Sequence, residues 1–277
     1  MITSIRKMFI SQKIIPICSI ILGILFIVTL LAPWIAPNDP IAVNLAYKLQ
    51  PPSVEFPLGT DHLGRCNLSR ILYGGRISLG FAMLIFISSL TIGLIIGTYS
   101  GYKGGWVDQV LMRICDGVMA FPSLILILGL VGIFGPGLPQ VVLALMLVQW
   151  VYYARMFRSM ALSLKEQNFI AAAKISGSSQ WKIIRNHIVP NVLPPLVVMG
   201  TLEMGWAIMD ISAMSFLGLG VQPPAAEWGA MIHEGKSYIR TNPELMLYPG
   251  LMIMLVIVTF NLLGEALSER YSVKRRS

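Results

Sequence analysis

The sequence predicts an all-α membrane protein in which six helices cross the bilayer and both chain ends lie in the cytoplasm. Of the 277 residues, 55% are apolar and only 12% are Asp, Glu, Lys or Arg, about half of the roughly 25% that is usual in a soluble domain. The apolar residues also gather into long runs that carry no charge. A water-soluble globule and a disordered chain both fit poorly, so lipid is the expected solvent.

The first expected span covers residues 14–35. A bilayer core of roughly 30 Å needs about 20 apolar residues in a helix, and this run has no charge. Pro16 and Pro33 fall near its ends, where they break few hydrogen bonds. The alternative is a secretory signal peptide, but its apolar core is usually only about 7–15 residues long. We therefore expect a retained anchor, with a cytoplasmic segment 1–13 before it and an outer segment 36–76 after it.

Five further spans are expected within the membrane core, residues 77–264. Each is an apolar run of sufficient length: 77–98, 113–133, 138–157, 188–217 and 245–263. The uncharged stretch between Asp116 and Arg155 is too long for one span. Its middle, residues 134–139, is rich in Gly and Pro and predicts a turn, so the third and fourth spans form a hairpin.

The distribution of basic residues sets the expected orientation. With the N-terminus inside, 15 of the 21 Lys and Arg residues fall in cytoplasmic segments and six fall outside. This bias and the even number of spans place both ends in the cytoplasm, including the basic tail 265–277. The net charge of +8 is therefore a sign of topology, and we expect no nucleic acid to bind.

The large cytoplasmic loop, residues 160–187, predicts two short helices. Good helix formers fill its first part, Gly177 begins a break, and helical spacing then resumes before the fifth span. The small side chains of Ala171, Ala172 and Ala173 would let another protein approach closely. A helix that lies on the lipid headgroups explains the same pattern equally well on physical grounds.

Residues 171–191 resemble the EAA loop of permeases from ATP-binding-cassette (ABC) importers. The resemblance is greatest to the C-type subunit of the dipeptide, oligopeptide and nickel transport family. Other segments resemble that family in order along nearly the whole chain: 58–65, 104–109, 121–122, 215–221, 227–231 and 260–264. Two positions depart from the family pattern, which usually has Glu where Ala171 stands and Asp where Cys66 stands.

The resemblance implies a transport subunit of the bacterial inner membrane, not an enzyme, with no cofactor of its own. Its implied partners are a second permease of similar fold, two cytoplasmic ATPases that hold ATP and Mg, and an extracytoplasmic solute-binding protein. The implied contacts to an ATPase are Asn168, Ala171, Ala172, Ala173, Gly177, His187 and Pro190. We expect Trp181, Ile184 and Pro190 to connect the docking helix to the fifth span by packing the second helix under the membrane, or only to anchor the loop.

Glu203 and Asp210 interrupt the fifth span. A charge at helix-centre depth costs about 2.5–3.5 kcal/mol on insertion scales. Their spacing of seven residues places both on one helix face, together with Trp206. This face is expected to line the translocation pathway, where its negative field suits a cationic metal chelate or a basic peptide, or else to bond to a neighbouring helix. The two acids alone do not predict a tight structural metal site.

The outer segment 221–244 is the expected dock for the solute-binding protein. It carries Trp228, Tyr238 and Arg240, and a mixture of aromatic and basic side chains suits a protein interface. An aromatic belt at the lipid surface explains Trp228 and Tyr238 almost as well.

Three other classes of function fit the sequence less well than the importer does. No nucleophile–base set and no phosphate-binding loop predicts an enzyme, and no filter-like motif predicts a channel. An ion-coupled secondary transporter would explain the intramembrane acids, but no inverted repeat is visible. For the substrate, residues 153–159 and 227–232 resemble nickel-type members slightly more, which favours nickel or a metal chelate over a dipeptide or oligopeptide.

Overall fold

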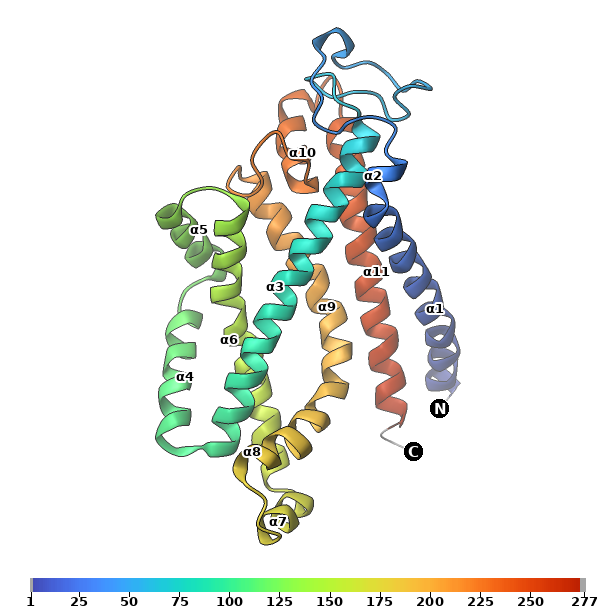
Figure 1. Cartoon of the computed structure of the whole chain (residues 1–277). Helices are drawn as coiled ribbons and strands as arrows, with labels where there is room; N and C mark the ends of the chain where they lie inside the picture. Colours follow the sequence, from blue (N-terminus) through green and yellow to red (C-terminus); the bar gives the residue numbers. More distant parts are fainter. Residues whose placement is uncertain (1, 275–277) are drawn as a thin grey trace. The chain divides into compact units, whose positions relative to one another are not determined.

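A computed structural model describes residues 2–274. The regular elements in that range are helices, and the one extended contact there is an isolated bridge between Thr60 and Cys66. The longer helices are α1 (Ile2–Leu30), α3 (Asn67–Lys103), α4 (Gly105–Met119), α5 (Ser123–Phe134), α6 (Leu138–Lys165), α9 (Val189–Phe216) and α11 (Glu244–Lys274) (Figure 1). The shorter ones are α2 (Ala32–Ile35), η1 (Leu45–Tyr47), α7 (Asn168–Ile175), α8 (Gln180–Ile183), the π-helical turn η2 (Ile184–Ile188), α10 (Trp228–Gly235) and η3 (Lys236–Tyr238). The predicted all-α class is confirmed. Arg275 and Arg276 of the expected basic tail lie outside the described residues.

Four helical segments are long and apolar enough to cross a membrane: Lys13–Leu30, Asn67–Lys103, Leu138–Lys165 and Glu244–Arg270. In two further pairs, a bend separates the two helical segments: Gly105–Met119 from Ser123–Phe134, and Gln180–Leu193 from Val198–Phe216. If each bent pair counts as one span, the described residues hold up to six. The structure therefore supports four to six spans, a range that includes the predicted six.

The third expected span, residues 113–133, is not one continuous helix, although the bent pair that contains it is one of the two that bring the count of spans to six. α4 ends at Met119, α5 begins at Ser123, and the two helices are bent by 88°. Pro122 explains the break, because it has no amide hydrogen and its ring disfavours helical backbone in the residue before it. α5 has 12 residues, and the roughly 18 Å that such a helix covers is shorter than a bilayer core.

The first span also differs from expectation. α1 begins at Ile2, so Pro16 lies inside the helix and not near its end. At the other end α1 stops at Leu30, and the short helix α2 follows with Pro33 in its first turn, a position that needs no amide hydrogen.

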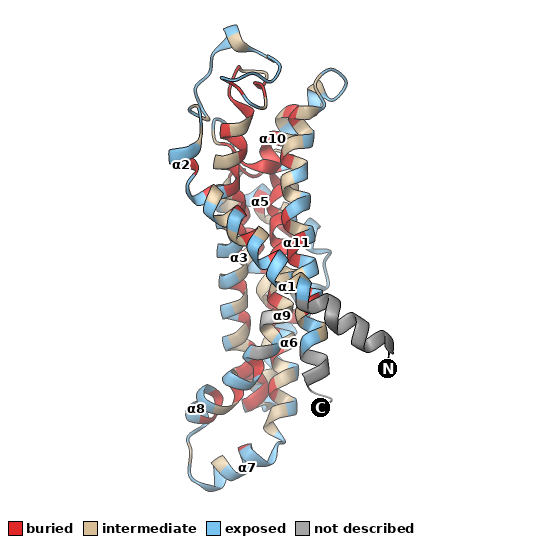
Figure 2. Cartoon of the chain, turned by 90° about the vertical axis from the view of Figure 1, so that its right-hand side faces the viewer, coloured by how far each residue is buried: buried red, intermediate tan, exposed pale blue. Residues whose placement is uncertain are grey.

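The chain forms two compact units. Unit 1 comprises Met1–Met83, Gly135–Val141 and Gly200–Ser277; unit 2 comprises Leu84–Phe134 and Val142–Met199. Within unit 1, α1 and α10 both pack against α11. Figure 2 shows that α10 is largely buried, whereas α1 has long exposed stretches. Exposed apolar side chains along α1 are what a helix in lipid presents to its surroundings.

Glycines bring α3 and α6 close together within unit 2. Gly93, Gly97 and Gly101 recur at every fourth position of α3. A Cβ atom at Gly97 would overlap the backbone oxygen of Ala154, and one at Gly101 would lie 2.7 Å from the backbone oxygen of Arg158. Small residues at this spacing are a common way for membrane helices to approach closely, so α3 and α6 form one tightly packed pair in this unit.

Candidate functional site

The loop between α6 and α9 contains the predicted helix, break and second helix. α7 ends at Ile175, and Gly177 then adopts φ +75°, a backbone conformation that glycine enters without steric cost. Ser179 caps α8 by accepting a hydrogen bond from the amide of Lys182. A helix stop followed at once by a new cap explains the sharp reversal at 176–179.

One side of this loop is buried in the core of unit 2. Ile170 of α7 and Ile183 of α8 lie in one cluster with Tyr102, Phe157 and Ile188. All of these side chains are buried, and Ala173 packs against the same cluster. The loop is therefore fixed to the helices of unit 2 and is not a loose connection.

The other side of α7 is exposed. Asn168, Ala171, Ala172 and Gly177 are all exposed, and Ile175 is 88% exposed. An accessible surface of small and apolar side chains on a buried base is the kind of surface that the ATPase-docking prediction requires.

The packing between the loop and the start of α9 comes mainly from isoleucines. Trp181 and Pro190 are exposed and contribute little packing within unit 2, so their expected place under the membrane stays a prediction. Ile184 is buried as expected, and Ile183 and Ile188 supply the remaining packing. Ile183, Ile184 and Ile188 repeat at the helical period, so this period alone could have identified them as buried positions.

His187 lies beside α7 as well as in the turn before α9. It is half-buried, with its ring 6.3 Å from that of Phe169, and its backbone oxygen accepts a hydrogen bond from the Asn191 side chain at 2.6 Å. These contacts help to hold the loop against the start of α9.

The candidate pathway residues lie on α9 within unit 1. Glu203 and Asp210 are half-buried, and Trp206 is 57% exposed. Both acids have interaction partners in the structure. Because the Trp206 side chain is mostly uncovered, this helix face remains available to a pathway or to a partner subunit.

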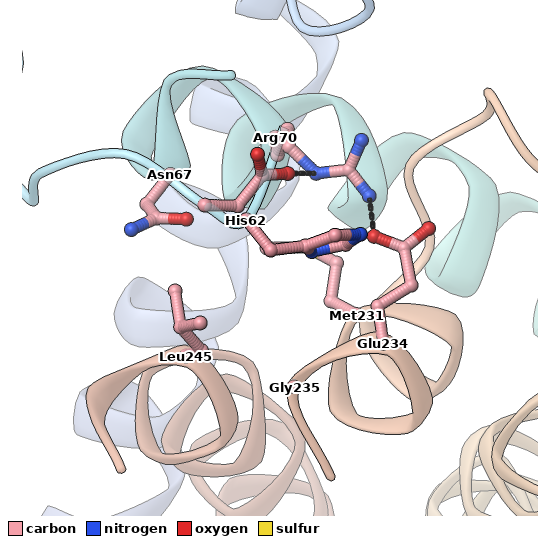
Figure 3. A pocket seen from close by; sticks show the side chains of 8 residues that line it. His62, Asn67, Arg70, Met231, Glu234, Gly235 and Leu245 are labelled. Carbon is pink, nitrogen blue, oxygen red and sulfur yellow. Dashed lines mark hydrogen bonds and ion pairs between the residues drawn. The ribbon is translucent and has the colours of Figure 1, made fainter. Parts of the chain in front are cut away.

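A buried cluster of charges in unit 1 was not predicted. Arg65 donates to Asp61 at 2.6 Å and to Glu234 at 2.5 Å. Arg70 donates to the same oxygen of Glu234 at 2.9 Å (Figure 3). Both arginine side chains are only 1% exposed. This outer charge cluster joins the segment before α3, the first turn of α3 and α10.

The local sequence shapes one half of the cluster. The Oδ1 atom of Asp61 accepts hydrogen bonds from the amides of Leu63 and Arg65 at 2.8 and 2.9 Å. Gly64 has φ +75°, and a Cβ atom there would overlap the backbone of Asn44. The segment 58–65, noted above only as a family resemblance, is thus a tight turn that aims Arg65 at its partners.

Asp61, His62 and Glu234 bring three metal-ligand atoms within 4.8 Å of one another. They line a cavity of about 10 Å³, enough for one water molecule. Two guanidinium groups already neutralise both carboxylates, and burial lowers the pKa of His62, with Asp61 and Glu234 opposing that shift. A divalent cation would leave an uncompensated charge of about +2 in a buried place, so the donor set fits a structural ion-pair cluster better than a cation site.

Trp228 is fully buried, so its predicted role in docking the binding protein, and equally in an aromatic belt, is wrong. Its indole donates to the backbone oxygen of Ile71 at 3.0 Å, and its ring lies against Gly74 and Gly75. The other two docking candidates stay at the surface: Tyr238 is half-buried and Arg240 is exposed.

Only part of the outer cluster had a signal in the sequence. Asp61 and Arg65 are four residues apart in a recognisable segment, but Glu234 lies 169 residues after Arg65. No local pattern connects positions so distant, and their pairing depends on how α10 packs.

The comparisons with known proteins agree on one family. A family model described as "Binding-protein-dependent transport system inner membrane component" matches residues 89–273, and one described as "N-terminal TM domain of oligopeptide transport permease C" matches residues 2–52. The nickel transport system permease protein NikC of Escherichia coli (strain K12) is 42% identical over 250 residues, 90% of each chain. The dipeptide transport system permease protein DppC of Alkalihalophilus pseudofirmus is 38% identical, over 93% of this chain and 85% of the relative.

A solved structure shares the fold. A chain of the MetNI methionine ABC transporter, in an inward-facing conformation, aligns with a TM-score of 0.56 at 18% identity. The alignment covers 73% of this chain and 95% of that chain.

These matches settle the class of protein. The chain is a multi-pass inner-membrane transport subunit that works with an ATPase and a binding protein; it is not itself an enzyme, and ATP is bound by the partner ATPase. This assignment to an ABC importer replaces the alternative function, an ion-coupled secondary transporter. The chain belongs to the binding-protein-dependent inner-membrane permeases of ABC importers, as a C-type subunit of the dipeptide, oligopeptide and nickel transport family.

Proposed function

We propose that this permease passes nickel or a metal chelate into the cytoplasm. The observation that carries the proposal is the pair of acids, Glu203 and Asp210, on one face of α9 beside the mostly exposed Trp206. Intramembrane acids are costly and usually mark a pathway or a partner contact. Two carboxylates on a pathway wall raise the local concentration of cations and lower that of anions.

The relatives support this substrate without deciding it. NikC, named as a nickel transport permease, is 42% identical to this chain, and DppC, named as a dipeptide transport permease, is 38% identical. A dipeptide or oligopeptide is therefore the second candidate, and a basic peptide would meet the same negative field.

The decisive experiment is uptake by the reconstituted transporter. The chain is assembled with its partner permease, ATPases and binding protein in vesicles, and ATP-dependent uptake of labelled nickel is compared with that of a labelled dipeptide. We expect nickel uptake to fall about tenfold in Glu203→Gln and Asp210→Asn, equivalent to ~1.4 kcal/mol. Glu265→Gln, an exposed acid on α11, is the matched control and should transport normally. Unchanged nickel uptake in both variants would show that Glu203 and Asp210 do not act in the pathway.

The exposed side of α7 is the proposed docking surface for an ATPase. Its small residues allow close approach, while the buried Ile170 fixes the helix to unit 2. In the assembled importer, two such permeases and two ATPases would form the complex, and closure of the ATPases would displace α7. The π-helical turn η2 lies between α8 and α9, and such turns are frequent at functional sites.

Gly177 offers a direct test of this docking surface. A Cβ atom there would meet nothing within 4 Å, so only the backbone conformation opposes a substitution. Gly177→Val should distort the turn and reduce co-purification of the ATPase, whereas Gly177→Asn should be tolerated, because Asn enters the left-handed region readily. Full co-purification and full transport in Gly177→Val would contradict the assignment.

For the binding protein, the surface around η3 remains the proposed dock. Arg240 is exposed, and Tyr238 stacks on His62 with ring centroids 5.6 Å apart. Arg240→Ala should lower the rate of binding-protein-stimulated uptake more at low salt than at high salt, because exposed charges act mainly on association. Uptake that is unaffected at every salt concentration would exclude Arg240 from the dock.

A further inference from the structure

Asp108, in the first turn of α4, is held by the two neighbouring helices. Arg158 of α6 donates to both of its carboxylate oxygens, at 2.5 and 2.6 Å, and Ser100 of α3 donates to one of them at 2.5 Å. Two parallel bonds between a guanidinium and a carboxylate fix direction as well as distance. The side chains of Asp108 and Arg158 are 13% and 33% exposed. We call these three residues the Asp108 clasp.

The same stretch of α3 reaches α7. Tyr102, two residues after Ser100, is buried in the cluster that contains Ile170 of α7. The ammonium groups of Lys165 and Lys174 lie 5.9 and 5.6 Å from the centre of its ring, within the range of a cation–π attraction. The end of α3 is thus tied to the end of α6 and to α7.

Close packing of α3 against α6 adds to these contacts. Gly97 and Gly101 bring the backbone of α3 against Ala154 and Arg158 of α6. Because both helices would have to separate before either could slide, a displacement of α7 is passed to α3 and α6 together. Within unit 2 these three helices therefore act as one packed body.

α4 is attached to that body more sparingly. Cys115 is the one fully buried residue of the helix, packed with Val151 and Ala154 of α6. Near it Asp116 pairs with Arg155 at 3.4 Å, but both of these side chains are about half exposed. Such exposed ion pairs contribute little to stability. The clasp is the more strongly hydrogen-bonded attachment, at the other end of α4.

We propose that the Asp108 clasp makes α4 move with α7, so that a displacement imposed by the ATPase reaches the bent pair α4–α5. Asp108 and Arg158 are positioning residues for transport: they hold α4 against α6 and touch no substrate. The inference rests on the proposed docking of an ATPase on α7. Loss of the clasp would leave α7 on its ATPase and let α4 lag behind.

The test uses the complete transporter in vesicles and measures three quantities: co-purification of the ATPase, ATP hydrolysis, and uptake of labelled nickel or dipeptide, whichever substrate the wild-type transporter accepts, per ATP hydrolysed. In Asp108→Asn we expect unchanged co-purification, hydrolysis within about twofold of wild type, and uptake per ATP at least tenfold lower. Arg158→Lys keeps the charge but loses the two parallel bonds, so its ratio should lie in between. Asp116→Asn, on the same helix and half exposed, is the control and should keep the wild-type ratio.

A second readout follows the helix directly. Spin labels at the exposed positions Gln109 on α4 and Ser163 on α6, which belongs to the same packed body as α7, should give a narrow distance distribution in the wild type and a broad one in Asp108→Asn. If the Asp108→Asn chain does not fold, Arg158→Lys decides by the same ratio and the same distances.

Two results would overturn the inference. One is a wild-type ratio of uptake to hydrolysis in Asp108→Asn and Arg158→Lys. The other is loss of ATPase co-purification in step with uptake, which would make the clasp part of docking or folding. If the wild-type chain itself neither retains an ATPase on α7 nor couples uptake to ATP, the proposed function fails instead.

Discussion

The outer charge cluster and the Asp108 clasp use the same chemistry at very different depths. In the cluster, Arg65 and Arg70 are 1% exposed and share Glu234. In the clasp, Arg158 is 33% exposed and has Asp108 as its carboxylate partner. A guanidinium with no access to water cannot leave its partner without a large cost in free energy, whereas one that is a third exposed can exchange its partner for solvent. The first arrangement suits a permanent joint, and the second suits a joint that carries motion.

Burial sets the size of the effect expected from each. Removing one partner of a buried pair leaves an uncompensated charge and costs about 3–5 kcal/mol. The partly exposed clasp should lie between that value and the about 0–1 kcal/mol of a fully exposed pair. Variants of the outer charge cluster should therefore lower mainly the stability, and variants of the Asp108 clasp should lower mainly the uptake per ATP hydrolysed.

Glu234→Gln is the strongest way to break the comparison. It leaves two buried arginines without that carboxylate, so the free energy of unfolding should fall by about 3–5 kcal/mol. The unfolding midpoint of the purified chain in detergent measures this. Glu55→Gln, an exposed acid of the same outer segment, should change stability by less than about 0.5 kcal/mol. Equal effects of the two variants would contradict the structural role of the cluster.

Gly97→Ala sharpens the account of unit 2. Its Cβ atom would overlap the backbone of Ala154, and forcing extra volume into a packed contact costs about 1–3 kcal/mol. Gly80→Ala, on the same helix, meets no atom within 4 Å and should be neutral or slightly stabilising, because Ala favours a helix over Gly by up to about 1 kcal/mol. In thermal unfolding in detergent, the midpoint of Gly97→Ala should fall below those of wild type and Gly80→Ala. A midpoint of Gly97→Ala equal to that of wild type would mean that α3 and α6 are less closely packed.

Arg155→Gln should have the smallest effect. Arg155 pairs with Asp116 at 3.4 Å, and the two side chains are 48% and 47% exposed. We expect a loss of less than about 1 kcal/mol, reduced further by salt. A loss as large as that of Glu234→Gln would show that burial does not rank these ion pairs.

Apolar length was enough to predict the class and the long helices, because a bilayer requires each span to be apolar over its whole length. It was not enough for the third span. Hydropathy does not register a break, and Pro122 divides a run that is apolar on both sides. The loop around α7 was predictable because its start, break and cap depend on neighbours in the sequence, with Gly177 and Ser179 as the signals.

The buried polar and aromatic contacts could not be predicted in the same way. Trp228 looked like a surface aromatic, yet its place is set by Ile71, which lies 157 residues earlier. Arg158 and Asp108 are 50 residues apart and were noted only as a basic residue and as part of a resembling segment. Such pairs depend on how helices approach each other, and only the glycine spacing of α3 carries that information in the sequence.

The most direct test of the account measures Glu234→Gln and Asp108→Asn side by side in the reconstituted transporter. For each, the amount of folded transporter and the substrate taken up per ATP hydrolysed are determined. Glu234→Gln should lower the folded amount and preserve the ratio, while Asp108→Asn should preserve the folded amount and lower the ratio. If both variants lower the same quantity, the division between a permanent joint and a motion-carrying joint is wrong.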